Sequence, residues 1–203
     1  TLVPLAPAPE EIIIESPSKK ILAGMIISVK IDLSSKNRLV WQREIDGQWI
    51  NVLYDSDFVV SCNDVGHRLR AVSSKGLESK PTNKIELEPV LALYIKAMLR
   101  TSSLTFTGNC KVGNTVWTIT ASPYGLTMET VKGTKKKSKW NLVQAEAVEG
   151  SLDEIVLCME SSSKFIMVSS FENYQSLNAL IRSDQVRDYV VMVIRGIKES
   201  HQK

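Results

Sequence analysis

Short runs of alternating apolar and polar residues, each ended by a turn signal, most restrict what this 203-residue chain can fold into. In one such run Ile27, Val29 and Ile31 alternate with polar residues, which is typical of a strand with one buried face. The dipeptide Asp46-Gly47 separates two further runs and predicts a tight hairpin, because both residues tolerate positive φ. Regular short strands over the first 88 residues predict a β-sandwich of about seven strands. The expected strands are 11–15, 27–33, 39–44, 48–54, 57–62, 68–74 and 83–88.

Particular residues narrow this β-sandwich to an immunoglobulin-like one. Trp41 lies in the third predicted strand, where such folds place a core tryptophan. The turn Asn63-Asp64-Val65-Gly66 comes just before the sixth strand, where Asp and Gly are common. The chain departs from the antibody pattern, because it has no cysteine pair to bridge the sheets and has His67 where a tyrosine is usual. Residues 1–88 are therefore predicted to be an immunoglobulin-like domain without an inter-sheet disulfide.

Residues 89–203 begin and end with helical patterns that enclose a second series of strand patterns. Pro89 suits a helix N-terminus and opens a connecting helix over 89–101 that we expect to fasten the two domains together. The apolar positions of this helix recur at spacings of three and four: Val90, Leu91, Tyr94, Ala97 and Met98. The strand candidates within 104–169 are 104–110, 115–121, 126–131, 140–148, 154–159 and 164–169.

The predicted helical C-terminus covers 171–200 in two segments. Ser170 is a candidate N-cap for the first segment, whose apolar face carries Tyr174, Leu177 and Ile181. The second begins near Ser183 or Asp184 and carries an amphipathic stripe: Val186, Tyr189, Val190, Val193, Ile194 and Ile197. Six or seven strands followed by a helix is the element order of a pleckstrin-homology (PH)-like β-barrel. The fold class is thus predicted as mainly β, an immunoglobulin-like β-sandwich fused to a PH-like β-barrel with a C-terminal helix.

Composition and cysteine usage favour a non-catalytic protein of the cytoplasm. Residues 1–88 carry 11 Lys/Arg and 12 Asp/Glu, whereas residues 89–203 carry 14 and 10, so only the second half is basic. Cys62, Cys110 and Cys158 are odd in number and widely spaced, which predicts reduced thiols and a cytosolic location. The chain has no N-terminal Met, so we expect it to be a piece of a longer protein. With His67 and His201 its only imidazoles and no nucleophile, phosphate-loop or metal motif, we expect no enzyme activity, cofactor or metal.

A cluster of five lysines is the most legible functional feature. It occupies residues 132–139, here called the lysine segment, which we expect to be a loop between the third strand of the second domain and Trp140. Lysines near a charged membrane add roughly 1 kcal/mol each, so the segment predicts binding to anions. The candidate residues are Lys132, Lys135, Lys136, Lys137 and Lys139, with Lys111 at the border and Arg195 and Lys198, on the outer face of the last helix, as weaker candidates. No arginine is available in the segment to grip phosphate bidentately, so binding is expected to be weak and dominated by charge.

The order of the two domains resembles a known family. An immunoglobulin-like segment that runs without a linker into a PH-like one, through ELEPVLALYIKAMLR and TVWTITASPYGLTM, resembles the C-terminal part of the plant stomatal closure-related actin-binding proteins. The resemblance covers the whole chain. It implies a dimeric parent with an actin-binding region and coiled coils, a role in cross-linking or stabilising actin filaments, and association with the cytoskeleton.

Three functions remain open from the sequence. The first is a regulatory and targeting module that binds inositol phosphates or phosphoinositides through the lysine segment. The second is a protein-interaction scaffold without lipid binding, and the third is a structural spacer within the parent. A lysine segment that merely aids solubility also fits. A nucleic-acid partner is disfavoured, because no aromatic residues are interleaved with the lysines to stack on bases. No dimer seam is evident, so we expect the fragment itself to be monomeric.

Overall fold

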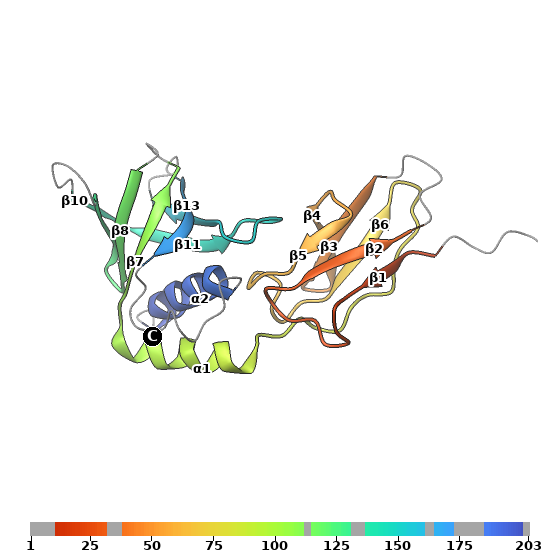
Figure 1. Cartoon of the computed structure of the whole chain (residues 1–203), viewed down its shortest axis with the longest axis horizontal. Coiled ribbons are helices and arrows are strands. Elements are labelled where there is room, and N and C mark those ends of the chain that lie inside the picture. Colours follow the sequence, from red (N-terminus) through yellow and green to blue (C-terminus); the bar gives the residue numbers. More distant parts are fainter. Residues whose placement is uncertain are drawn as a thin grey trace, which may run out of the picture.

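The computed structural model describes residues 11–31, 38–111, 115–130, 137–160, 165–172 and 185–200, and it is mainly β. The first half contains two three-stranded antiparallel sheets, one in the order β1-β2-β5 and the other in the order β4-β3-β6 (Figure 1). Side chains from both sheets share one apolar core, in which Trp41 and Phe58 are fully buried with ring centroids 5.3 Å apart. The strands are β1 Ile13–Glu15, β2 Ile26–Lys30, β3 Leu39–Ile45, β4 Gln48–Leu53, β5 Asp57–Val59 and β6 Leu69–Ser73.

The predicted hairpin and core tryptophan of the first half are confirmed. Asp46 and Gly47 connect β3 to β4 with φ of 50° and 78°, the positive values for which this dipeptide is preferred. The predicted strand at 83–88 is wrong, because only isolated bridges occur there, at Ile85 and Glu86. The amides of Ser79, Thr82 and Ile85 do donate to carbonyls of Ala71, Leu69 and His67, but their spacing of three residues is incompatible with a regular ladder.

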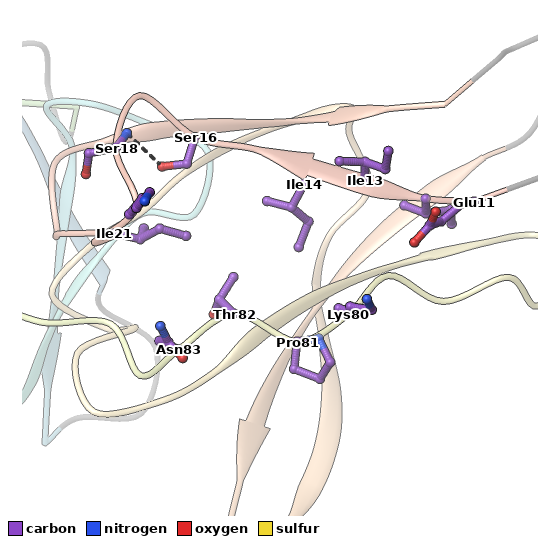
Figure 2. A pocket seen from close by; sticks show the side chains of 12 residues that line it. Glu11, Ile13, Ile14, Ser16, Ser18, Ile21, Lys80, Pro81, Thr82 and Asn83 are labelled. Atoms are coloured by element: carbon purple, nitrogen blue, oxygen red, sulfur yellow. Dashed lines mark hydrogen bonds between the residues drawn. The ribbon is translucent and has the colours of Figure 1, made fainter.

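An open seam separates β1 from the segment 80–83 at one side of the first half (Figure 2). Further along, the amide of Ala23 donates to the carbonyl of Glu86 at 3.1 Å and closes the seam. The seam is therefore a groove between the two sheets, closed at the end near Ala23 and open along β1.

The second half is a seven-stranded antiparallel sheet in the order β10-β9-β8-β7-β13-β12-β11, curled into a half-barrel (Figure 1). Helix α1, followed by a short 3₁₀ helix η1, leads into it, and α2 packs against its concave side. The elements are α1 Pro89–Met98, η1 Leu99–Thr101, β7 Leu104–Cys110, β8 Thr115–Ser122, β9 Gly125–Thr130, β10 Lys137–Trp140, β11 Leu142–Ala147, β12 Ile155–Met159, β13 Phe165–Glu172 and α2 Val186–Glu199. None of the described helices is both long and apolar enough to cross a bilayer.

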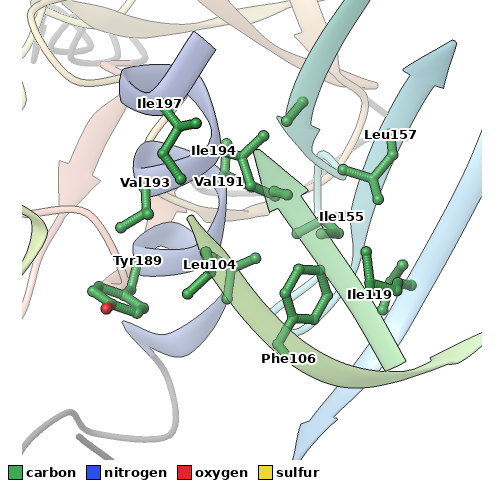
Figure 3. Close-up of a cluster of buried hydrophobic side chains, with 14 of the residues drawn as sticks. Leu104, Phe106, Ile119, Ile155, Leu157, Tyr189, Val191, Val193, Ile194 and Ile197 are labelled. Carbon is green, nitrogen blue, oxygen red and sulfur yellow. The ribbon is translucent and has the colours of Figure 1, made fainter. Parts of the chain in front are cut away.

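The core of the second half lies between the curled sheet and α2. Phe106 and Ile119 from the sheet are fully buried (Figure 3), and so are Tyr189 and Val193 from α2. All six apolar residues predicted for this helical stripe are buried, so the stripe is confirmed as a packing face. Many residues of α2 are β-branched and have only modest helix propensity. The helix forms nevertheless, because packing of its apolar face against the sheet stabilises it.

Two helix predictions need correction. The buried face of α1 consists of Leu91, Ile95 and Met98, whereas Val90 and Ala97, assigned to that face by spacing, are exposed. Ser170 does not cap a helix, because β13 continues to Glu172. The first predicted helical segment, with Tyr174, Leu177 and Ile181, lies outside the described residues.

Gly196 allows α2 to approach η1 closely, because it has no side chain facing Leu99. A Cβ atom at this position would lie 2.6 Å from Leu99 Cδ2 and 2.8 Å from Leu99 Cδ1. Alanine favours helix by about 1 kcal/mol over glycine, but forced overpacking costs about 1–3 kcal/mol. We therefore expect Gly196→Ala to lower the free energy of unfolding in urea. The double variant Gly196→Ala/Leu99→Ala should cost less than the sum of the two single variants, and additive costs would contradict this contact.

Candidate functional site

One rim of the curled sheet lies close to several of the residues that the sequence assigns to anion binding, Lys111, Lys137 and Lys139. Neighbouring strands are antiparallel, so the end of β7, the start of β8, the end of β9 and the start of β10 all meet at this rim. Lys111 directly follows β7, and residues 131–136 connect β9 to β10. Three strand spacings of about 4.8 Å separate β7 from β10, or about 14 Å. A ligand with several phosphates, or a charged surface, can span this distance.

Lys111 is half exposed at this rim and already has a partner. Its Nζ lies 2.5 Å from Glu154 Oε1, and its backbone amide donates to the carbonyl of Met167 at 3.0 Å. The ion pair partly neutralises the lysine, so a phosphate would compete with Glu154 for it. Lys111 is thus a weaker anion ligand than its sequence position implied.

The lysine segment falls partly within a strand. Lys132, Lys135 and Lys136 lie outside the described residues, whereas Lys137 and Lys139 belong to β10, in register with Glu129 and Thr127 of β9. Assignment of the whole segment to a loop is therefore wrong for these last two lysines. Residues 137–140 contain neither Gly nor Pro and pair with β9 through their backbone, which the high charge density of the segment does not reveal.

Arg195 does not lie on an outer face of α2 as predicted. Its Nε donates to the carbonyl of Ala145 at 2.8 Å, and its Nη2 donates to Asn63 Oδ1 at 2.7 Å. These bonds occupy the guanidinium at the contact between the two halves, called the junction below. Lys198, by contrast, is half-buried beside a shallow hollow lined by Tyr124 and Glu160.

A buried ion triad is the centre of the junction. Arg43 on β3 is only 8% exposed; its Nε donates to Asp64 Oδ1 at 2.7 Å and its Nη2 to Glu149 Oε1 at 2.7 Å. Asp64 is fully buried, and its Oδ2 also accepts the amide of Ser61 at 2.7 Å. Burial raises the pKa of the Asp64 carboxyl to about 6, with Arg43 acting in the opposite direction. Since Glu149 belongs to the second half, Arg43 links both halves through charge.

A second buried pair lies at the start of α2. Asp188 is fully buried and accepts the amide of Cys62 at 3.0 Å and Nε of Arg187 at 3.0 Å. Arg187 is 1% exposed and also donates to the carbonyls of Val60 and Ser151. Burial raises the pKa of Asp188, opposed by the charge of Arg187.

Asn63 completes the junction by acting as a short extension of the sheet. Its Nδ2 donates to the carbonyl of Ala147 at 2.8 Å, and its Oδ1 accepts the amide of Ala147 at 3.3 Å. An amide side chain that pairs with both backbone groups of one residue replaces a neighbouring strand at the end of β11. The turn 60–64 of the first half is thus bonded to the second half through Val60, Cys62 and Asn63.

The surroundings of the cysteines and of His67 indicate structural rather than catalytic roles. All three cysteines are free, and burial raises the pKa of the Cys110 thiol to about 11, which disfavours a reactive thiolate. His67 Nδ1 lies 2.8 Å from the carbonyl oxygen of Glu44, so the ring donates to the backbone. Across the part of the chain that the structure describes, no group of three His, Cys, Asp or Glu side chains is placed to hold a metal ion.

Comparison with known proteins gives no relative: no family model, no curated protein and no solved structure matches the chain.

The buried triad predicts a large loss of stability when its arginine is replaced. Arg43→Met keeps an apolar stem but leaves Asp64 without its counter-charge, and breaking a buried pair in this way costs about 3–5 kcal/mol. Urea denaturation should report that loss in the free energy of unfolding. Arg68→Met is the matched control, because Arg68 pairs with Glu44 at 2.5 Å but is 44% exposed. The control should cost much less, because an exposed ion pair is screened by solvent, and equal costs would refute the importance of the triad.

The raised pKa of Asp64 predicts a pH dependence of defined sign. An unfolded aspartate has a pKa near 3.9, so between about pH 4 and pH 6 the folded chain holds a proton that the unfolded chain has lost. Stability from this group is then highest below pH 4, falls by at most about 1.4 kcal/mol per pH unit through the window, and is level above it. The stability of the wild type minus that of Asp64→Asn, from urea denaturation between pH 4.5 and 7.5, should show this fall. A difference that rises with pH would mean that pairing with Arg43 outweighs burial.

Proposed function

We propose that the chain is a non-catalytic regulatory and targeting module of an actin-binding, filament-bundling and stabilising protein, and that its lysine segment weakly binds inositol phosphates or phosphoinositides. The observation that carries the anion-binding part of the proposal is the rim, where β7 and β9 end and β8 and β10 begin on the same side of the sheet. Actin filaments are bound through other parts of the parent in this proposal, and the module works in the cytoplasm at the cytoskeleton.

The arrangement of strands supports an immunoglobulin-like first domain over residues 1–88. The sheets β1-β2-β5 and β4-β3-β6 correspond to the A-B-E and C′-C-F strands of that fold, with buried Trp41 on the C strand. The segment 79–86 takes the place of the G strand beside β6.

The second half, over residues 89–203, supports a PH-like domain. Seven antiparallel strands curl around one C-terminal helix, and three of the predicted ligands, Lys111, Lys137 and Lys139, lie in or next to strands that meet at one rim. Each lysine near an anionic surface adds roughly 1 kcal/mol, and this attraction is screened by salt. Weak, salt-sensitive binding to several phosphates at once is the behaviour that such a rim favours.

The junction favours a second candidate function, that of a protein-interaction or structural spacer without lipid binding. Buried charges with partners in both halves hold the halves in a fixed relation. A spacer needs such rigidity, whereas a lipid-binding module does not require it. Both candidates predict the same stability but differ in binding to anionic vesicles.

Co-sedimentation with vesicles that contain phosphatidylinositol 4,5-bisphosphate separates these candidates. We expect the chain to bind at 50 mM salt, to bind severalfold less at 200 mM, and to lose most binding when Lys135, Lys136 and Lys137 become Ala. The matched control replaces Lys75, Lys80 and Lys84 of the first half by Ala, which removes the same charge elsewhere and should leave most binding intact. Undiminished binding by the first triple variant would remove the assignment to the lysine segment, and no binding at either salt concentration would favour the spacer.

A further inference from the structure

The groove between β1 and the segment 80–83 is a second surface, on the first half and separate from the rim. It has a volume of about 440 Å³. Figure 2 shows Ile14 projecting from β1 into the space opposite Thr82, with Ile21 and Ser16 at one end. The groove is thus bounded by a strand edge on one wall and by an irregular segment on the other.

The register of β1 directs its unused backbone groups into this groove. The amide of Val29 on β2 donates to the carbonyl of Ser56, so Val29 faces β5 and its neighbours on β2 face β1. Backbone groups in an antiparallel strand alternate in direction, and Ile13 and Glu15 are in register with those neighbours. It follows that the N–H and C=O of Ile14 point away from β2, and no described residue forms a hydrogen bond with them.

The opposite wall is held in place and does not close onto β1. The amide of Thr82 donates to the carbonyl of Leu69 at 2.8 Å, and that of Ser79 donates to Ala71 at 2.9 Å, so the segment is attached to β6. Pro81 between them has no amide to offer. An unpaired strand edge beside a fixed wall is a template for an incoming strand, as in recognition by β-strand addition.

The side chains around the groove indicate the chemistry of its occupant. Ile13 is 50% exposed, and Ile14 is half-buried, so the strand edge presents aliphatic surface to both of its sides. Lys19 and Lys80 at the margin form no ion pair with any described residue, and Glu11 is the one acidic side chain among the lining residues. Two free cations against one carboxylate are complementary to an acidic ligand.

From these observations we infer that the groove binds an extended peptide of a partner protein, which adds as a strand to β1. Its backbone pairs with the N–H and C=O of Ile14, alternate aliphatic side chains pack on Ile14 and Ile21, and an acidic side chain lies against Lys19 and Lys80. β1 spans three residues, or about 10 Å at 3.3 Å per residue, so recognition is restricted to a short core motif.

Selection of random decapeptides on the full 203-residue chain tests this inference. We expect enriched peptides to alternate Val, Ile, Leu or Thr with other residues and to contain Asp or Glu. Addition of a selected synthetic peptide should slow hydrogen exchange at the Ile14 amide at least tenfold. A selection without this pattern, or a peptide that leaves exchange at Ile14 unchanged, would overturn the inference.

Two variants examine the backbone and the charges separately. Ile14→Pro removes the amide that faces the groove without removing a β1–β2 bond, and it should weaken the selected peptide at least tenfold. Asn51→Pro on β4, the edge strand of the other sheet, is the matched control and should bind the peptide like the wild type. Should Ile14→Pro fail to fold, Lys19→Glu/Lys80→Glu decides the matter: it should weaken binding at least fivefold, whereas Lys96→Glu on α1 should not. Full affinity in the double variant would overturn the inference.

Discussion

Pairing of buried charge at the junction is the interaction on which the arrangement of the two halves depends. Asp64 and Asp188 are fully buried, and a carboxylate in that position is costly unless it is paired and hydrogen-bonded. Asp64 obtains Arg43 from its own half, and Arg43 in turn requires Glu149 from the other. Asp188 obtains Arg187 from its own helix and the amide of Cys62 from the other half. Neither set is complete until both halves have folded and met, which makes the junction selective for one relative placement.

The two halves of the chain are not fully separate domains, because they share part of one core. Along the sequence the division lies near residue 88, but Cys62 packs in the core of the second half. The turn that carries Cys62 leaves β5 at Val59 and returns to β6 at Leu69, so a loop of the first half supplies part of the second core. Interfaces between domains usually permit relative motion. Here the buried polar network and the shared core oppose relative motion, because separation of the halves would leave buried ionised groups without their partners.

Features set by local chemistry could be predicted from the sequence, and those set by distant partners could not. The Asp46-Gly47 hairpin follows from backbone preference, and the stripe on α2 follows from helical period, so both were accessible. Arg187 and Asp188 stand between apolar positions of that stripe and look like exposed polar residues, because their partners at 60–62 are about 126 residues away along the chain. Arg195 was misplaced for the same reason. The strand prediction for 83–88 was wrong because the hydrogen bonds of this segment recur every three residues. Alternation of apolar and polar residues indicates only a two-residue repeat.

The two proposed binding surfaces differ in physical kind, and the junction determines how they relate. The proposed rim site depends on lysine charge, and attraction between exposed charges is screened within about 10 Å at 0.1 M salt. The groove offers backbone hydrogen bonds and aliphatic contact, which salt hardly screens, with charge only at its margin. Ionic strength should therefore weaken attachment at the rim while the groove retains its peptide. Because buried charge fixes the two halves relative to each other, a partner held in the groove would keep a defined position with respect to any anionic surface at the rim.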